Sequence, residues 1–187
     1  MPAGGLTPTS LPLVHKTVWQ SENETRAFAE ALAGHAEIAC AFIELRGDLG
    51  AGKTTFARHL LRELGVRGRI KSPTYTVVLP YEVALPQQFA QENKTLLGPS
   101  LAIWHFDFYR FTDAREWEDA GFREIFADEG LKLAEWPEKA RSLLPLADLV
   151  IEIAWQADGA GAGDDQPGEA RNVTLTAQTE TGLKLLQ

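Results

Sequence analysis

Apolar residues follow two patterns along the chain: short, almost unbroken runs, and stripes at helical spacing. A run of about four to eight apolar residues predicts a buried strand, and apolar residues at i, i+3 and i+4 predict a helix with one buried face. The two patterns alternate, which is typical of an α/β fold. The predicted strands are 40–45, 101–109, 131–135 and 149–155, and the predicted helices between them are 54–64, 114–120 and 122–128.

Weaker strand signals flank these runs. β-branched and aromatic residues predict a strand at 76–79, with 81–84 as a candidate continuation, and a short strand at 15–19. The stretch 172–177 is predicted to be the hairpin partner of 149–155. These antiparallel additions to strands separated by helices indicate a mixed parallel and antiparallel sheet.

Segments rich in Pro, Gly and polar residues separate these elements. Residues 1–13 are predicted to be a disordered tail, and residues 14–187 a single domain, since domains commonly have about 100–200 residues. The polar segment 85–100, bracketed by prolines, predicts a surface loop between paired strands. The Gly- and Asp-rich segment 157–170 predicts a flexible connection.

Helix-capping signals predict where two helices begin or end, and the position of the cysteine predicts whether it is buried. Ser21 and Glu24 have the spacing of a capping box, so a helix is predicted to begin at Ser21 and to end near Gly34. Pro137 is predicted to start another helix. Cys40 is the only cysteine, which excludes a disulfide framework, and its place in the first apolar run predicts a buried small side chain.

Composition narrows the class of protein. The chain has 187 residues and is 44% hydrophobic, which suits a domain with a substantial core. No apolar run approaches the roughly 18 residues of a membrane helix, and the N-terminus lacks the pattern of a signal peptide. We therefore expect a cytoplasmic protein without membrane contact.

Charge is unevenly distributed. The net charge of −8 argues against general nucleic-acid binding. The segment 46–71, however, has seven Lys or Arg against two acidic residues, a balance of +5, so the rest of the chain carries −13. Two interpretations remain open: a solvated helix face beside a ligand site, or a docking surface for an acidic partner or for RNA.

The strongest motif lies between the first apolar run and the helix after it. Gly47, Gly52, Lys53 and Thr54 have the spacing G-x-x-x-x-G-K-[ST] of a phosphate-binding P-loop. Such a loop curls its N–H groups around an anion at a helix N-terminus. Lys53 is predicted to contact the β- and γ-phosphates of a nucleoside triphosphate, and the Thr54 hydroxyl to hold Mg²⁺. The residues predicted to bind the nucleotide here are Asp48, Leu49, Gly50, Ala51, Gly52, Lys53, Thr54 and Thr55.

Three further residues are candidates to complete the site. Asp107 closes an apolar strand among aromatic residues, where a carboxylate is costly to bury without a cation, so it is predicted to support Mg²⁺. Glu135 ends another strand and is predicted to orient or deprotonate the attacking water, or to bind Mg²⁺. Thr74 follows the P-loop helix in a Ser-Pro-Thr segment that reads either as a nucleotide-sensing loop or as a plain strand entry. Trp136 is expected to pack either on the nucleotide base or in the core.

Four motifs occur together and in this order, at 47–55, 72–75, 105–110 and 135–138. In this combination the chain resembles the TsaE family, the bacterial ATPase of tRNA threonylcarbamoyladenosine synthesis, from about Trp19 to Leu186. The H-x-D-x-Y-R and E-W motifs carry more of this resemblance than the P-loop does. The loops at 85–100 and 157–170 look longer than is typical of the family.

The resemblance implies a small P-loop NTPase with a three-layer αβα sandwich around the mixed sheet. It implies ATP and Mg²⁺ as ligands, Lys53 and Thr54 at the phosphates and metal, and Thr74 as a nucleotide sensor. Asp107 and Glu135 would support metal binding and hydrolysis. It also implies that the protein works with the TsaB–TsaD pair, which transfers the threonylcarbamoyl group to an adenosine of tRNA. ATP turnover would reset that complex, so contact with tRNA would be indirect.

Two other functional classes are weighed against this expectation. A small-molecule kinase on a P-loop scaffold needs arginines over the transferred phosphate and an acceptor pocket. Arg110 and Arg115 are available, but no acceptor pocket can be identified from the sequence. A nucleotide-switched binding module would need the phosphate site without appreciable turnover.

Overall fold

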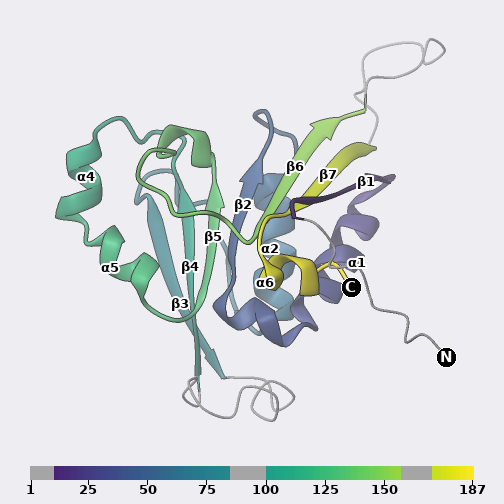
Figure 1. Cartoon of the computed structure of the whole chain (residues 1–187), viewed down its shortest axis with the longest axis horizontal. Helices are drawn as coiled ribbons and strands as arrows, with labels where there is room; N and C mark the ends of the chain where they lie inside the picture. Colours follow the sequence, from purple (N-terminus) through teal and green to yellow (C-terminus); the bar gives the residue numbers. More distant parts are fainter. Residues whose placement is uncertain (1–10, 85–99, 157–169) are drawn as a thin grey trace, which may run out of the picture.

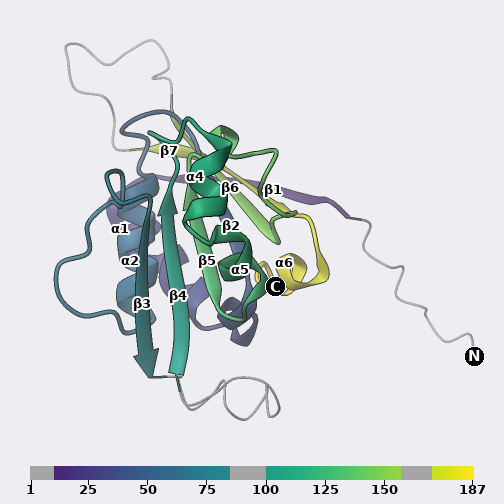
Figure 2. The ribbon, with the colours of Figure 1, turned by 90° about the vertical axis from the view of Figure 1, so that its left-hand side faces the viewer.

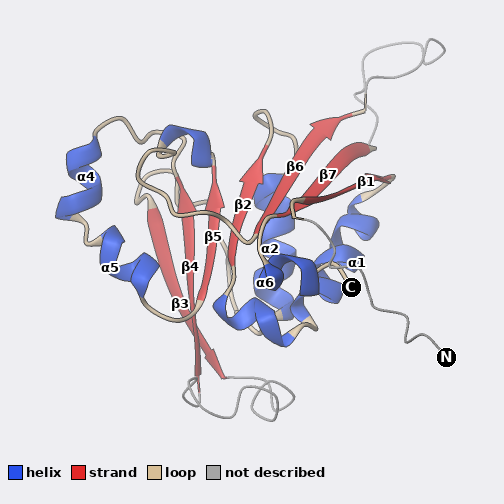
Figure 3. Cartoon of the chain, in the orientation of Figure 1, coloured by secondary structure: helices blue, strands red, loops and turns tan. Residues whose placement is uncertain are grey.

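A computed structural model describes residues 11–84, 100–156 and 170–187 and contains a seven-stranded sheet in the order β1-β7-β6-β2-β5-β4-β3. Helices lie on both sides of the strands (Figures 1 and 3). The strands are β1 (Leu13–Trp19), β2 (Phe42–Arg46), β3 (Val78–Ala84), β4 (Ser100–Asp107), β5 (Leu131–Glu135), β6 (Leu149–Trp155) and β7 (Arg171–Ala177). The α-helices are α1 (Glu22–Ala33), α2 (Lys53–Glu63), α4 (Ala114–Asp119), α5 (Phe122–Ala127) and α6 (Glu180–Lys184), and the 3₁₀-helices are η1 (Ala36–Cys40) and η2 (Pro137–Lys139).

The sheet is mixed, as predicted. β2 pairs in parallel with β5 and β6, and β5 pairs in parallel with β4. β3 pairs antiparallel with β4, and β7 pairs antiparallel with both β6 and β1. Because parallel strands end at the same edge of a sheet, the residues after β2, β4 and β5 are brought together there.

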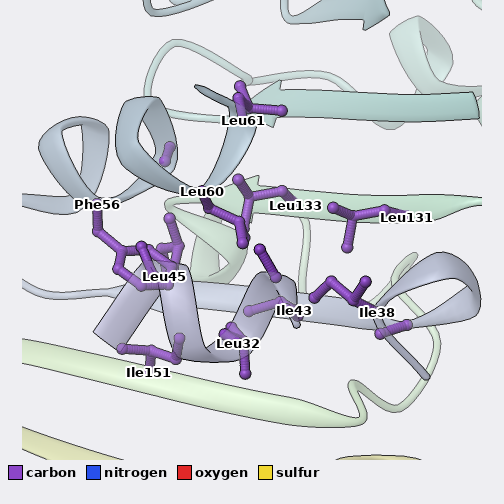
Figure 4. Packing of buried hydrophobic residues seen from close by; sticks show 14 of the residues in the cluster. Leu32, Ile38, Ile43, Leu45, Phe56, Leu60, Leu61, Leu131, Leu133 and Ile151 are labelled. Atoms are coloured by element: carbon purple, nitrogen blue, oxygen red, sulfur yellow. The ribbon is translucent and has the colours of Figure 1, made fainter. Parts of the chain in front are cut away.

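One face of the sheet is covered by α1 and α2. Phe56 and Leu60 are one turn apart on α2 and fully buried, and Figure 4 shows them beside Leu45 and Leu133 of the strands beneath. Burying such a side chain contributes about 1.5–3 kcal/mol. This packing fixes α2, and with it the P-loop, on the central strands.

An aromatic cluster covers the other face. Phe106 of β4 and Phe122 of α5 meet edge to face with ring centroids 5.4 Å apart, and Trp117 of α4 stacks on Phe126 at 5.3 Å. Ile103 belongs to the core on the α1 and α2 side, so the side chains of β4 alternate between the two faces of the sheet. In Figure 2, β3 and β4 lie between α1 and α2 on the left and α4 and α5 on the right, which is the expected three-layer arrangement.

Several predicted boundaries are wrong. β3 begins at Val78 because residues 74–76 form a turn and Val77 takes a positive φ of 63°. β4 ends at Asp107, after which the Phe111 N–H closes a turn on the Phe108 carbonyl.

Three local expectations also need correction. Cys40 ends η1 and is exposed, because the chain turns there before entering β2 at Phe42. The Ser21 side chain makes no capping bond, and the Glu24 carboxylate accepts from the Gln20 N–H at 2.8 Å instead. Pro137 opens only a single 3₁₀ turn.

The predicted N-terminal tail and long loops fall largely outside the described residues. β1 begins at Leu13, inside the segment predicted as tail. The paired strands expected around each loop are present, since β3 pairs with β4 and β6 with β7. Within the described part of the chain, no helix combines the length and the apolar character needed to cross a bilayer.

Candidate functional site

The P-loop connects β2 to α2 at the carboxyl edge of the sheet. Gly47 has a φ of 133°, and a Cβ atom there would lie 2.0 Å from the Ile153 carbonyl oxygen of β6. Only glycine therefore lets the loop leave β2 this close to its neighbour. Gly52 caps α2 with a φ of 114°, so the first turn of the helix opens toward the loop.

Lys53 lies at the centre of the loop and is buried. Its ammonium donates to the carbonyl oxygens of Gly47 at 2.6 Å and Asp48 at 2.8 Å, and it lies 3.8 Å from the centre of the Trp136 ring. Burial lowers the pKa of Lys53, and nearby carboxylates, Glu135 foremost, act against that shift. Backbone carbonyls and an aromatic face thus hold the Lys53 ammonium in place. Phosphate oxygens are suited to replace the two carbonyl oxygens as its hydrogen-bond acceptors.

Asp107 connects β4 to the segment after α2. Its Oδ2 accepts from the hydroxyls of both Ser72 and Thr74 at 2.5 Å, and its Oδ1 accepts from the Tyr109 N–H at 3.0 Å. The carboxylate is 3% exposed. The structure therefore brings the Ser-Pro-Thr segment into hydrogen-bond contact with the aspartate.

Glu135 connects β5 to α2. Its Oε2 accepts from the Thr54 hydroxyl at 2.7 Å, and its Oε1 lies 2.9 Å from Nε2 of His105. In the sheet register, Glu135 is opposite both Leu45 of β2 and Asp107 of β4. Strand pairing alone therefore places the two carboxylates beside each other at the end of the P-loop strand.

These elements enclose a pocket of about 370 Å³. Within the P-loop, the Asp48 carbonyl accepts from Lys53, Ala51 is fully buried, and Leu49 is exposed. Trp136 is half-buried and packs against the aromatic cluster, as the core alternative predicted, and its ring also lines the pocket beside Lys53. The pocket is lined by Leu49, Gly50, Gly52, Lys53, Thr54, Thr55, Arg58, Ser72, Thr74, Asp107, Tyr109, Glu135 and Trp136.

A second hollow of about 180 Å³ lies on the other side of the P-loop, between Trp19 and Arg171. The Arg171 guanidinium donates to the Ala51 carbonyl at 2.9 Å and stacks on Trp155 at 3.4 Å. Sequence reasoning missed Trp19 and Arg171 because they come from β1 and β7, on the other side of β2 from β5 and β4, and no motif connects these strands to the loop. It also missed Arg58, whose helical spacing one turn after Thr54 was the available signal.

The oxygen donors in the larger pocket fit Mg²⁺ arriving with a nucleotide. Among the described residues, no group of three or more His, Cys, Asp or Glu side chains is placed to hold a metal. Thr54, Asp107 and Glu135 offer a hydroxyl and two buried carboxylates. Mg²⁺ is commonly bound by one or two carboxylates together with substrate phosphates, so this set is complete only with a phosphate present.

Comparisons with known proteins identify the family of the chain. A family model described as "Threonylcarbamoyl adenosine biosynthesis protein TsaE" matches residues 19–162. The chain is 38% identical over 162 residues to the TsaE protein of Haemophilus influenzae, covering 86% of this chain and 85% of that one. It is 34% identical over 161 residues to the TsaE protein of Bacillus subtilis, covering 85% and 84%.

A solved structure shares the fold. The crystal structure of YdiB from Bacillus subtilis superposes with a TM-score of 0.62 at 26% identity, and the match covers 95% of each chain. The match of the family model over most of the chain, supported by these relatives, shows that the chain belongs to the TsaE family of tRNA threonylcarbamoyladenosine biosynthesis proteins.

Proposed function

We propose that this protein binds ATP with Mg²⁺ and hydrolyses it. The observation that carries this proposal is the convergence of Lys53, Thr54, Asp107 and Glu135 on one pocket at the N-terminus of α2. Lys53 serves phosphate recognition. Thr54, Asp107 and Glu135 serve metal-assisted hydrolysis. Bound Mg²⁺ would neutralise charge on the β- and γ-phosphates.

Each side chain has a defined part in this proposal. Lys53 exchanges the carbonyl oxygens of Gly47 and Asp48 for phosphate oxygens, and remains protonated in doing so. The Thr54 hydroxyl donates its hydrogen bond to Oε2 of Glu135, so the lone pairs of the hydroxyl oxygen are available to a metal. Asp107, held by two hydroxyl donors, faces the same pocket and acts through the metal.

The hydrolytic step is an attack of water on the γ-phosphorus with cleavage of its bond to the bridging oxygen. Glu135 is the carboxylate at the pocket that orients this water. The nucleoside would then extend over the P-loop toward the hollow lined by Gly50, Thr55 and Arg171.

The first test is the affinity of the Lys53→Ala variant for a fluorescent ATP analogue. We expect affinity to fall about tenfold or more, at least ~1.4 kcal/mol, because a cation next to the phosphates is lost. Lys139→Ala, which removes an exposed lysine of η2, is the matched control and should bind as the wild type does. Circular dichroism checks that both variants fold. Wild-type affinity in folded Lys53→Ala protein would refute the phosphate site.

We also propose that ATP turnover serves the TsaB–TsaD pair, which threonylcarbamoylates an adenosine of tRNA, and resets that complex between cycles. Membership of the TsaE family supports this assignment. Phosphate release measured with and without small-molecule acceptors separates hydrolysis from a kinase activity, because a kinase would release phosphate only slowly and transfer it to an acceptor.

A further inference from the structure

His105 is a buried polar residue that the proposed mechanism does not use. It lies on β4, is fully buried, and is opposite Leu133 in the register with β5. Ile103 two residues earlier is fully buried on the same face of the strand. A polar ring in such surroundings is costly unless its nitrogen atoms are hydrogen-bonded.

Only one of its two ring nitrogens has a partner in the described part of the chain. Nε2 lies 2.9 Å from Oε1 of Glu135, whereas Nδ1 is buried with no hydrogen-bond partner among the described residues. A carboxylate oxygen only accepts, so Nε2 is the nitrogen that carries the proton. A second proton on Nδ1 would be a buried donor without an acceptor. The geometry therefore places a proton on Nε2 and leaves Nδ1 without a hydrogen-bond partner among the described residues.

The bond divides the two oxygens of Glu135 between the core and the pocket. Oε1 is held by His105 on the core side, and Oε2 accepts from Thr54 on the pocket side at 2.7 Å. Without His105 the carboxylate would keep one of these two hydrogen bonds, the one from Thr54, and its last torsion would be less restricted. The backbone of β5 positions the residue, but it does not fix this torsion.

We propose that His105 is a positioning residue that orients the Glu135 carboxylate for its work at the Mg²⁺–nucleotide site. This inference rests on the proposed function, since it assumes that Glu135 acts there. Partners that hold metal-site ligands in place typically contribute 10–100-fold to metal affinity or activity, and an effect of about this size is expected.

The first test needs neither metal nor nucleotide. In ¹⁵N-labelled wild-type protein, long-range ¹H–¹⁵N correlations of the imidazole report which nitrogen carries the proton. We expect the Nε2–H form for His105, and loss of its single fixed tautomer in the Glu135→Ala variant. A proton on Nδ1, or a His105 signal unchanged by Glu135→Ala, would overturn the proposal.

The second test separates positioning from packing with three variants. His105→Gln keeps an N–H donor near Nε2, His105→Met removes it at similar volume, and Leu133→Met alters the same packing without touching the Glu135 bonds. The measured quantities are the Mg²⁺ concentration for half-maximal phosphate release and the nucleotide affinity in EDTA.

We expect His105→Met to raise the Mg²⁺ requirement about 10–100-fold and to leave metal-free nucleotide affinity within about twofold. His105→Gln and Leu133→Met should stay within about threefold of wild type on both measures, a change under ~1 kcal/mol. Equal effects of His105→Gln and His105→Met would show that the donor is irrelevant and reject positioning. Unchanged Mg²⁺ dependence in Glu135→Ala would instead refute the proposed role of Glu135, while the tautomer measurement would still test the His105 bond.

Discussion

At the scale of single residues, the site is a set of buried charges, each held by hydrogen bonds. Lys53, Asp107 and Glu135 are all nearly inaccessible, and burying a charge is costly unless it is hydrogen-bonded or paired. Asp107 accepts from two hydroxyls and one N–H, and Lys53 donates to two carbonyls. Because most of these partners are neutral, the site keeps charge available for a ligand.

Asp107→Asn should separate metal-assisted chemistry from nucleotide binding. The amide preserves the shape of the side chain but removes its negative charge, whereas the P-loop and Lys53 are unchanged. We expect steady-state phosphate release to fall by about tenfold or more, ~1.4 kcal/mol of barrier, with nucleotide affinity within about threefold. Turnover within about threefold of wild type would mean that Asp107 is structural.

Lys132 offers a pH test away from the site. It is 5% exposed on β5, its ammonium donates to the Asp128 carbonyl, and burial lowers its pKa, with Asp128 acting against the shift. Between this lowered pKa and the ordinary value of 10.5, the unfolded chain binds more protons than the folded one. The contribution of Lys132 to the free energy of unfolding of the wild type therefore rises as the pH rises through that window.

Lys132→Met is accordingly expected to match or exceed the wild type in stability at neutral pH, by about 1 kcal/mol, because it removes a buried charge. Its advantage should shrink as the pH is raised to about 9.5, below the ordinary lysine pKa. Urea unfolding at the two pH values measures this, with exposed Lys139→Met as control. A difference from wild type that grows with pH would contradict the assignment.

At the scale of elements, the P-loop is defined by how closely β2 approaches β6. A side chain at position 47 would collide with the backbone of Ile153, whereas no atom lies within 4 Å of a Cβ atom added at Gly52. Both glycines have a positive φ, so an alanine at either position has a strained backbone. Only at position 47 is a steric clash added, so comparing the two variants measures the effect of that clash.

Gly47→Ala should therefore be far more damaging than Gly52→Ala. We expect a loss of about 3 kcal/mol in the free energy of unfolding for Gly47→Ala, since a strand backbone must move, and about 1–2 kcal/mol for Gly52→Ala from strain alone. Urea denaturation of both variants measures the difference. Equal losses would show that the close approach to β6 does not constrain the loop.

At the scale of the whole molecule, positive charge collects beside the nucleotide pocket of an otherwise acidic protein. A hollow of about 450 Å³ is lined by Arg58, Arg62, Arg69 and Lys71, together with Ile70 and Ser72. Arg58 and Ser72 also line the nucleotide pocket, so the two surfaces are continuous. Arg110, one of the two arginines available for the kinase alternative, lies over the Tyr75 ring at 4.4 Å.

We expect slow phosphate release from the isolated chain and clear acceleration by the TsaB–TsaD pair. Groups supplied to such a site in trans contribute about 10³–10⁵ in rate in other phosphate-transfer systems, which sets the upper range. The double variant Arg67→Glu/Arg69→Glu should lose stimulation while keeping its basal rate. Arg123→Glu/Arg141→Glu, an equal charge change at exposed positions elsewhere, is the control. Fast hydrolysis that partners do not affect would favour a self-contained enzyme.

The sequence by itself determined the features that depend on residues close together in the chain. The P-loop, the parallel strands, the two faces of β4 and the strand-end positions of Asp107 and Glu135 follow from motif spacing and from hydrophobic periodicity. These signals are read within one element, because the backbone alone sets which side chains share a face. Boundaries such as the start of β3 were predicted less well, because the positive φ of Val77 has no residue-type signal.

Only the tertiary structure decided which of these residues touch. β5 lies between β2 and β4 in the sheet although it follows both in the chain, and this order brings Glu135 between Thr54 and His105. The same holds for Trp136 over Lys53 and for Arg171 on the P-loop carbonyl. Such contacts join residues 30 to 120 positions apart. They depend on strand order and helix packing, which no local pattern of side chains encodes.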